Sequence, residues 1–134
     1  MAIMIHYWTH DVEKIMKYYI EKLAFDLEYR QPSDSAANFC ILRMADSKIM
    51  FAIAPSSQIL PDRKDYLVLQ NINKRTGSPG LISVYIGIND INGYFKKIKN
   101  NKAEIIEPIW DTPWNLRQFS VLDPDENITT FFSE

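Results

Sequence analysis

Residues 11–24 read DVEKIMKYYIEKLA, and residues 90–103, 79 positions later in a chain of 134, read DINGYFKKIKNNKA. Each stretch opens on an aspartate, a favourable helix N-cap residue, and then repeats apolar side chains on a 3.6-residue period. The apolar positions of the two stretches are Val12, Ile15, Met16, Tyr19 and Leu23, and Ile91, Tyr94, Phe95 and Ile98. Lysines fill much of the opposite side in both. The sequence therefore predicts two amphipathic helices that are copies of one unit.

Strand-like runs surround both helices in the same order. One run precedes each helix and three follow it, at 3–9, 25–30, 38–44 and 49–54 for the first helix, and at 81–88, 104–110, 116–122 and 128–133 for the second. We therefore expect an α+β protein of two βαβββ modules in tandem, which form a curled mixed sheet with a cleft. The expected organisation is one domain over residues 1–134, with module 1 at about 1–55, a linker at about 56–79 and module 2 at about 80–134.

Composition excludes several classes of function. Fifteen Lys and Arg residues against seventeen Asp and Glu residues leave a formal net charge of -2, whereas a phosphate-backbone binder is strongly basic. No apolar run reaches the ~18–20 residues of a membrane span, and no basic segment precedes the first apolar residues as in a signal peptide. The single cysteine excludes an intrachain disulfide. We expect a soluble cytoplasmic protein with no nucleic-acid or membrane partner.

Alternation along the strands predicts which side chains the helices leave uncovered. In the runs 3–9 and 81–88, the mostly aliphatic set suits the helix side, so the other set faces away from the helix. The residues that face away are Met4, His6, Trp8, Ser83, Tyr85 and Gly87. This mixed, aromatic lining is typical of a small-molecule site.

The segment 119–128 (FSVLDPDENI), the Asp11-Val12 helix opening and the doubled βαβββ order together resemble the vicinal oxygen chelate superfamily. This superfamily includes glyoxalases, bleomycin resistance proteins, fosfomycin resistance proteins and extradiol dioxygenases. The resemblance spans nearly the whole chain, and Asp-Pro-Asp-x-Asn is its most specific part. It implies the glyoxalase/bleomycin resistance fold. The chain departs from the pattern at Ala24 and Glu126, where the family usually has glycine, so we expect Glu126 in a tight turn at some conformational cost.

The resemblance also bears on metal binding. Metal-dependent members hold a divalent ion through His and Glu at one position on each of four inward strands. Counted from the aspartates of the two motifs, these positions correspond here to Met4, Met50, Ser83 and Thr130. None of these is a usual ligand for such an ion. We therefore expect no metal and no cofactor, and a closest similarity to the metal-free bleomycin resistance proteins.

Aromatic residues make up 13% of the chain and offer flat faces for planar ligands. Residues 110–119 (WDTPWNLRQF) resemble the Pro-Trp segment of bleomycin resistance proteins, in which aromatic side chains stack on the drug within clefts between two subunits. That resemblance implies Trp114 and, more loosely, Phe39 as ligand-binding residues. Strand alternation and loop position add His6, Trp8, Tyr85 and Trp110, and Arg117 or Glu107 would orient the ligand.

Purely structural roles are the alternatives for these residues. Trp110 and Trp114 would cap a sheet edge, and Trp8 and Tyr85 would form the core of a subunit interface. Cys40 is expected to be a buried small hydrophobic residue rather than a nucleophile.

Three functions stay open. The first is a metal-free homodimer that sequesters a planar or aromatic small molecule, as in bleomycin-type antibiotic resistance, with no catalytic residue. The second is a metal-dependent enzyme of the same superfamily, a glyoxalase-like lyase or isomerase or a dioxygenase, whose ligands lie elsewhere. The third is a metal-independent lyase or isomerase that uses His6 with Tyr85 or Arg117.

Overall fold

The computed structural model describes residues 4–53, 72, 74–76 and 83–134. Almost all of the linker expected at 56–79 therefore lies outside the described residues, as do the first residues of the strands expected at 3–9 and 81–88. In the described part, no helix has both the length and the apolar character needed to cross a membrane.

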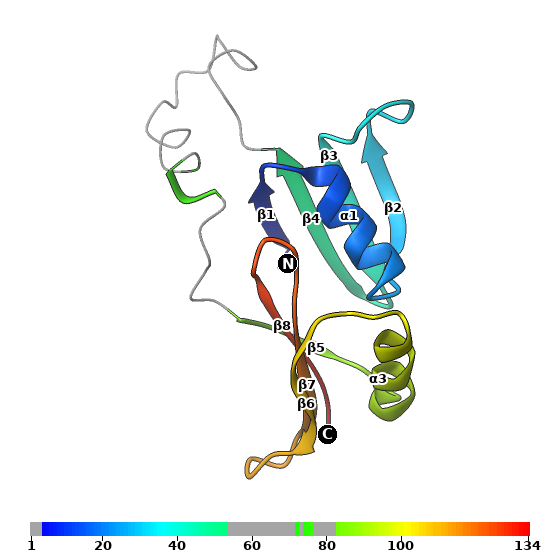
Figure 1. Cartoon of the computed structure of the whole chain (residues 1–134), viewed down its shortest axis with the longest axis vertical. Helices are drawn as coiled ribbons and strands as arrows, with labels where there is room; N and C mark the ends of the chain where they lie inside the picture. Colours follow the sequence, from blue (N-terminus) through cyan, green and yellow to red (C-terminus); the bar gives the residue numbers. More distant parts are fainter. Residues whose placement is uncertain (1–3, 54–71, 73, 77–82) are drawn as a thin grey trace.

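The tandem βαβββ order is confirmed, and each module forms its own four-stranded sheet (Figure 1). Module 1 consists of β1 (Ile5–Thr9), α1 (Val12–Glu21), β2 (Asp26–Gln31), β3 (Phe39–Met44) and β4 (Ser47–Ile53). Module 2 consists of β5 (Ser83–Gly87), α3 (Ile91–Asn100), β6 (Ile105–Asp111), β7 (Arg117–Leu122) and β8 (Ile128–Ser133). The strand orders are β1-β4-β3-β2 and β5-β8-β7-β6, and in each sheet the first strand pairs in parallel with the last strand of its module.

Both predicted helix starts are confirmed. The Asp11 carboxylate accepts a hydrogen bond from the Lys14 backbone N–H, and the Asp90 carboxylate accepts one from the Gly93 N–H, each at 3.0 Å. These bonds satisfy donors that have no partner in the first turn of a helix.

Each helix buries its apolar stripe on one face of its own sheet. Val84 and Ile86 of β5 are buried on that side, whereas Tyr85 between them is 50% exposed, as the alternation predicted. Cys40 is buried as expected, and desolvation raises the pKa of its thiol to about 11.

The residues in the two expected glycine positions have left-handed backbone conformations. The φ angles are 61° at Ala24 and 65° at Glu126. Glu126 closes the turn between β7 and β8, where its N–H donates to the Asp123 carbonyl at 2.9 Å. The expected tight turn is therefore present.

Side chains from both helices connect the two modules. The Tyr19 hydroxyl donates to Asp123 Oδ2 at 2.9 Å, and the Tyr94 hydroxyl donates to the Leu23 carbonyl at 2.6 Å. The neighbouring Tyr18 hydroxyl donates to the Leu122 carbonyl at 2.9 Å. The contacts between the modules thus involve the ends of α1 and β7, and α3. They lie away from the face of each sheet that is opposite its helix.

Candidate functional site

Each sheet has a second face, which no helix of the described residues covers. The module 1 face comprises His6, Trp8, Tyr29, Phe39, Ile41 and Met50, which lie side by side across β1, β4, β3 and β2. The module 2 face comprises Tyr85, Glu107, Trp110, Gln118, Ser120, Thr130 and Phe132.

The module 1 face carries a continuous aromatic cluster. The ring centroids of His6 and Trp8 are 4.5 Å apart, and those of His6 and Phe39 are 6.5 Å apart in an edge arrangement. The Tyr29 ring lies 6.1 Å from Phe39 and is 48% exposed. Desolvation lowers the pKa of His6 below 6.5, which favours the neutral imidazole at neutral pH. The structure thus brings together three of the predicted site residues and adds Tyr29.

A β-bulge explains why sequence reasoning missed Tyr29. The register of β2 against β3 shifts between Leu27 and Tyr29, so Leu27 lies opposite Leu42 and Tyr29 lies opposite Ile41. Regular alternation would give Tyr29 and Leu27 the same side of the sheet. The extra residue brings Tyr29 to the face of Phe39 instead.

Aromatic side chains also lie on the module 2 face. The Tyr85 and Phe132 rings are 6.1 Å apart, and Phe132 lies over Gly87, where an added Cβ would be 3.5 Å from its ring. Trp110 and Trp114 meet edge to face at 5.8 Å, and Trp114, in the loop between β6 and β7, is 56% exposed. Phe132 was not predicted, although alternation along β8 places it with Thr130.

Polar side chains lie beside these rings. Glu107 Oε1 accepts hydrogen bonds from Gln118 Nε2 at 3.1 Å and from the Ser120 hydroxyl at 3.2 Å. The Ser120 and Thr130 hydroxyl oxygens are 2.7 Å apart. Of these residues, the sequence predicts Glu107 as an orienting group, and Thr130 is the residue that stands where metal-dependent members of the superfamily have a ligand.

Arg117 lies on the α3 side of the sheet. Its Nε donates to Asn92 Oδ1 on α3 at 2.9 Å, and its guanidinium pairs with the Asp111 carboxylate at 3.0 Å. The structure therefore places Arg117 on the opposite side of the sheet from Tyr85 and Trp110.

The positions that correspond to the metal ligands of the superfamily do not fit a divalent cation. Met4 and Met50 offer thioethers, and Ser83 and Thr130 offer hydroxyls, whereas such an ion takes imidazole, carboxylate or thiolate. The Thr130 oxygen is already hydrogen-bonded to Ser120. Over residues 4–53 and 83–134, no three His, Cys, Asp or Glu side chains come together as a metal site.

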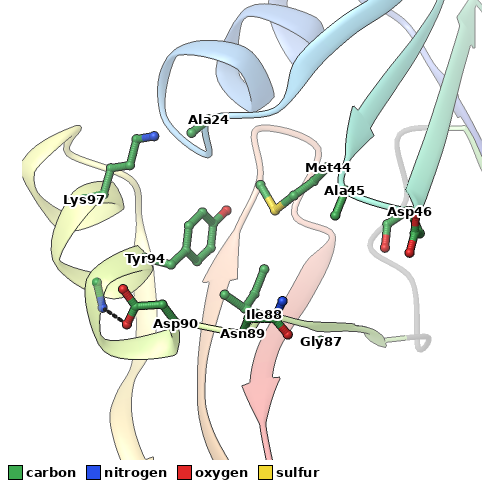
Figure 2. Close-up of a pocket in the computed structure, with 12 residues that line it drawn as sticks. Ala24, Met44, Ala45, Asp46, Gly87, Ile88, Asn89, Asp90, Tyr94 and Lys97 are labelled. Atoms are coloured by element: carbon green, nitrogen blue, oxygen red, sulfur yellow. Dashed lines mark hydrogen bonds between the residues drawn. The ribbon is translucent and has the colours of Figure 1, made fainter.

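A separate hollow of about 670 Å³ lies between the two modules (Figure 2). Its walls are the turn between β3 and β4, Ala24, the segment that leads from β5 into α3, and α3 itself. Much of its polar lining serves the fold, because the Asp90 carboxylate caps α3 and the Tyr94 hydroxyl bonds to Leu23. Sequence reasoning did not predict this hollow, whose walls come from distant parts of the chain.

Comparison with known proteins places this geometry in a family. The chain matches the model of the Glyoxalase/Bleomycin resistance protein/Dioxygenase superfamily over residues 3–131 and belongs to that superfamily. No curated protein matches the chain.

Several solved structures share the fold at low sequence identity. TioX from Micromonospora sp. ML1 is 17% identical with a TM-score of 0.74, covering 100% of this chain and 96% of that one. A glyoxalase/bleomycin resistance protein/dioxygenase from Nocardioides is 19% identical with a TM-score of 0.68, covering 99% and 82%. The hypothetical protein SA1046 from S. aureus is 13% identical with a TM-score of 0.67, covering 99% and 93%. These similarities show the fold alone.

Proposed function

We propose that this protein binds a planar aromatic small molecule without metal and without a chemical step, as in bleomycin-type antibiotic resistance. The observation that carries the proposal is the exposure of aromatic side chains, above all of Tyr29 and Tyr85 on the two helix-free faces and of Trp114 in the loop between β6 and β7. A flat ligand stacked on these rings would remove apolar area from water, at ~25 cal/mol per Å² before the costs of association.

A homodimer is part of the proposal. The modules of one chain meet through Tyr18, Tyr19, Tyr94 and Asp123, so neither aromatic face closes over the other. A second copy would lay one module's face against the other module's face and enclose the ligand between them. We also propose that the two modules act as one domain, because the Tyr19–Asp123 bond between them is buried. A single buried thiol, Cys40, suits a reducing compartment, in line with a cytoplasmic location.

Calorimetry on the purified protein tests the binding proposal. The titrants are bleomycin and acridine, and native mass spectrometry looks for a small molecule that copurifies. We expect acridine to bind, and Trp8→Ala or Tyr85→Ala to weaken binding by about tenfold through lost ring contact. Leu27→Ala is the control, since Leu27 is also exposed but lies on the side of its sheet that faces α1. Absence of heat with every planar titrant, or an equal loss in the control, would contradict the proposal.

An enzyme of the same superfamily is the second candidate. His6 favours it, because a neutral imidazole beside Trp8 can accept a proton from a bound substrate. Turnover of a small metabolite that survives EDTA but disappears in His6→Ala would replace binding with catalysis as the function.

A further inference from the structure

The module 2 face contains a buried acceptor without a donor. Gln118 is only 3% exposed, and its Nε2 donates to Glu107. Its Oε1 is buried and has no hydrogen-bond partner among the described residues. The Glu107 carboxylate can only accept, so it holds the amide with Nε2 toward itself and Oε1 turned away.

Hydrogen-bond direction makes the rest of this cluster acceptor-rich as well. The Ser120 hydroxyl has one proton, which it donates to Glu107 Oε1. The bond between Ser120 and Thr130 must then be donated by Thr130. The Ser120 proton therefore goes to Glu107 and the Thr130 proton goes to Ser120, so neither hydroxyl has a proton left to donate, and both offer a ligand oxygen lone pairs beside the Glu107 carboxylate.

The unpaired oxygen belongs to the helix-free side of the sheet. Gln118 alternates with Phe119, which is fully buried under α3, so its side chain lies on the other face. Its cross-strand neighbours are Trp110 on β6 and Phe132 on β8. Trp110 is exposed and Phe132 is partly exposed, so a ligand that reaches Oε1 from this face would lie beside both rings.

We propose that the module 2 face selects planar ligands that carry a cationic N–H donor, such as a protonated aminoheteroaromatic ring or an amidinium group. The ligand N–H donates to Gln118 Oε1, its positive charge lies near the Glu107 carboxylate, and its ring stacks among Tyr85, Trp110 and Phe132. This inference rests on the proposed binding function and names the chemical class of the ligand.

Three probes of similar shape separate stacking, charge and hydrogen bonding. Acridine is neutral and has no N–H at neutral pH, 10-methylacridinium is cationic without N–H, and 9-aminoacridine is cationic with N–H donors. We expect the affinities measured by calorimetry to rise in that order. The increase in affinity from 10-methylacridinium to 9-aminoacridine should be about tenfold, which is the contribution of one hydrogen bond to a buried acceptor.

Two variants test which residue causes each increase in affinity along the series of probes. Gln118→Met removes the acceptor at similar volume and should abolish the preference for 9-aminoacridine over 10-methylacridinium. Glu107→Gln keeps an acceptor for Gln118 but removes the charge, and should reduce the preference for 10-methylacridinium over acridine. Asn100→Met is the control, since Asn100 is exposed at the end of α3, on the helix side of its sheet, and it should leave both preferences unchanged.

The outcomes distinguish this inference from the proposed function. Equal affinities for the three probes overturn the inference and leave planar binding intact, whereas no binding of any probe overturns both. If Gln118→Met does not fold, the NMR resonance of the Gln118 side-chain amide is measured in the unmodified protein instead, with each probe added in turn. A shift with 9-aminoacridine that 10-methylacridinium does not produce supports the inference, and identical spectra overturn it.

Discussion

At the scale of single residues, the Asp123 carboxylate has two structural roles. It accepts hydrogen bonds from the backbone N–H groups of Asp125 and Asn127, from the Asn127 side-chain amide and from the Tyr19 hydroxyl. It shapes the turn between β7 and β8 and also binds the helix of the other module. A residue of the motif that carries the resemblance in the sequence is thus also one of the points where the two modules join.

Removal of this carboxylate should destabilise the whole chain. Asp123→Ala leaves the Tyr19 hydroxyl and three N–H donors without their acceptor, so we expect a loss of about 3–5 kcal/mol in the free energy of unfolding. Urea denaturation followed by circular dichroism measures it. Asp125→Ala is the control, because Asp125 contributes only its backbone N–H to the bonds described here, and alanine keeps that N–H. The free energy of unfolding of this variant should fall by less than about 1 kcal/mol. Equal losses in the two variants would contradict this role.

At the scale of elements, most of the fold could be predicted because each signal is local. Two aspartates capped the helices, an apolar stripe set their buried side, and alternation in β5 set the exposure of Tyr85. The position of Arg117 could also have been predicted, since it alternates in step with the buried Phe119 and Val121 on the α3 side of β7.

The rest of the candidate site depends on contacts that no local pattern encodes. Tyr29 reaches the module 1 face only through the bulge in β2. Gln118 becomes important only when Glu107, from the neighbouring strand, fixes its amide and leaves Oε1 unpaired. Both features arise between strands, so the sequence of either strand alone could not predict them.

The turn between β7 and β8 should gain stability from glycine. Glu126 has a φ of 65°, a conformation that disfavours side chains with a Cβ. We expect Glu126→Gly to raise the free energy of unfolding by about 0.5–1 kcal/mol, relief of backbone strain being partly offset by the greater entropy of the unfolded chain. Glu126→Ala keeps the Cβ and should give no such gain. A gain of the same size in both variants would mean that loss of the carboxylate, rather than backbone geometry, is responsible.

At the scale of the whole molecule, the exposed faces predict self-association. A stable interface buries about 800 Å² on each partner, and two faces lined with aromatic rings offer suitable surfaces. Sedimentation equilibrium should therefore show a dimer, and Tyr85→Asp should shift it toward monomer by placing a charge on the module 2 face. Leu27→Asp, a comparable change away from both faces, should leave the dimer intact. A monomer at every concentration would contradict the dimeric arrangement.

The shape of the hollow between the modules depends on how the two modules are oriented relative to each other. One wall belongs to the turn between β3 and β4 and the other to α3, while the buried Tyr19–Asp123 bond lies where the two halves meet. A change in the angle between the two modules would therefore change the distance between Met44 and Lys97 across the hollow. A ligand that changes the angle between the two sheets would therefore also change the shape of this hollow, although the ligand itself binds elsewhere on the protein.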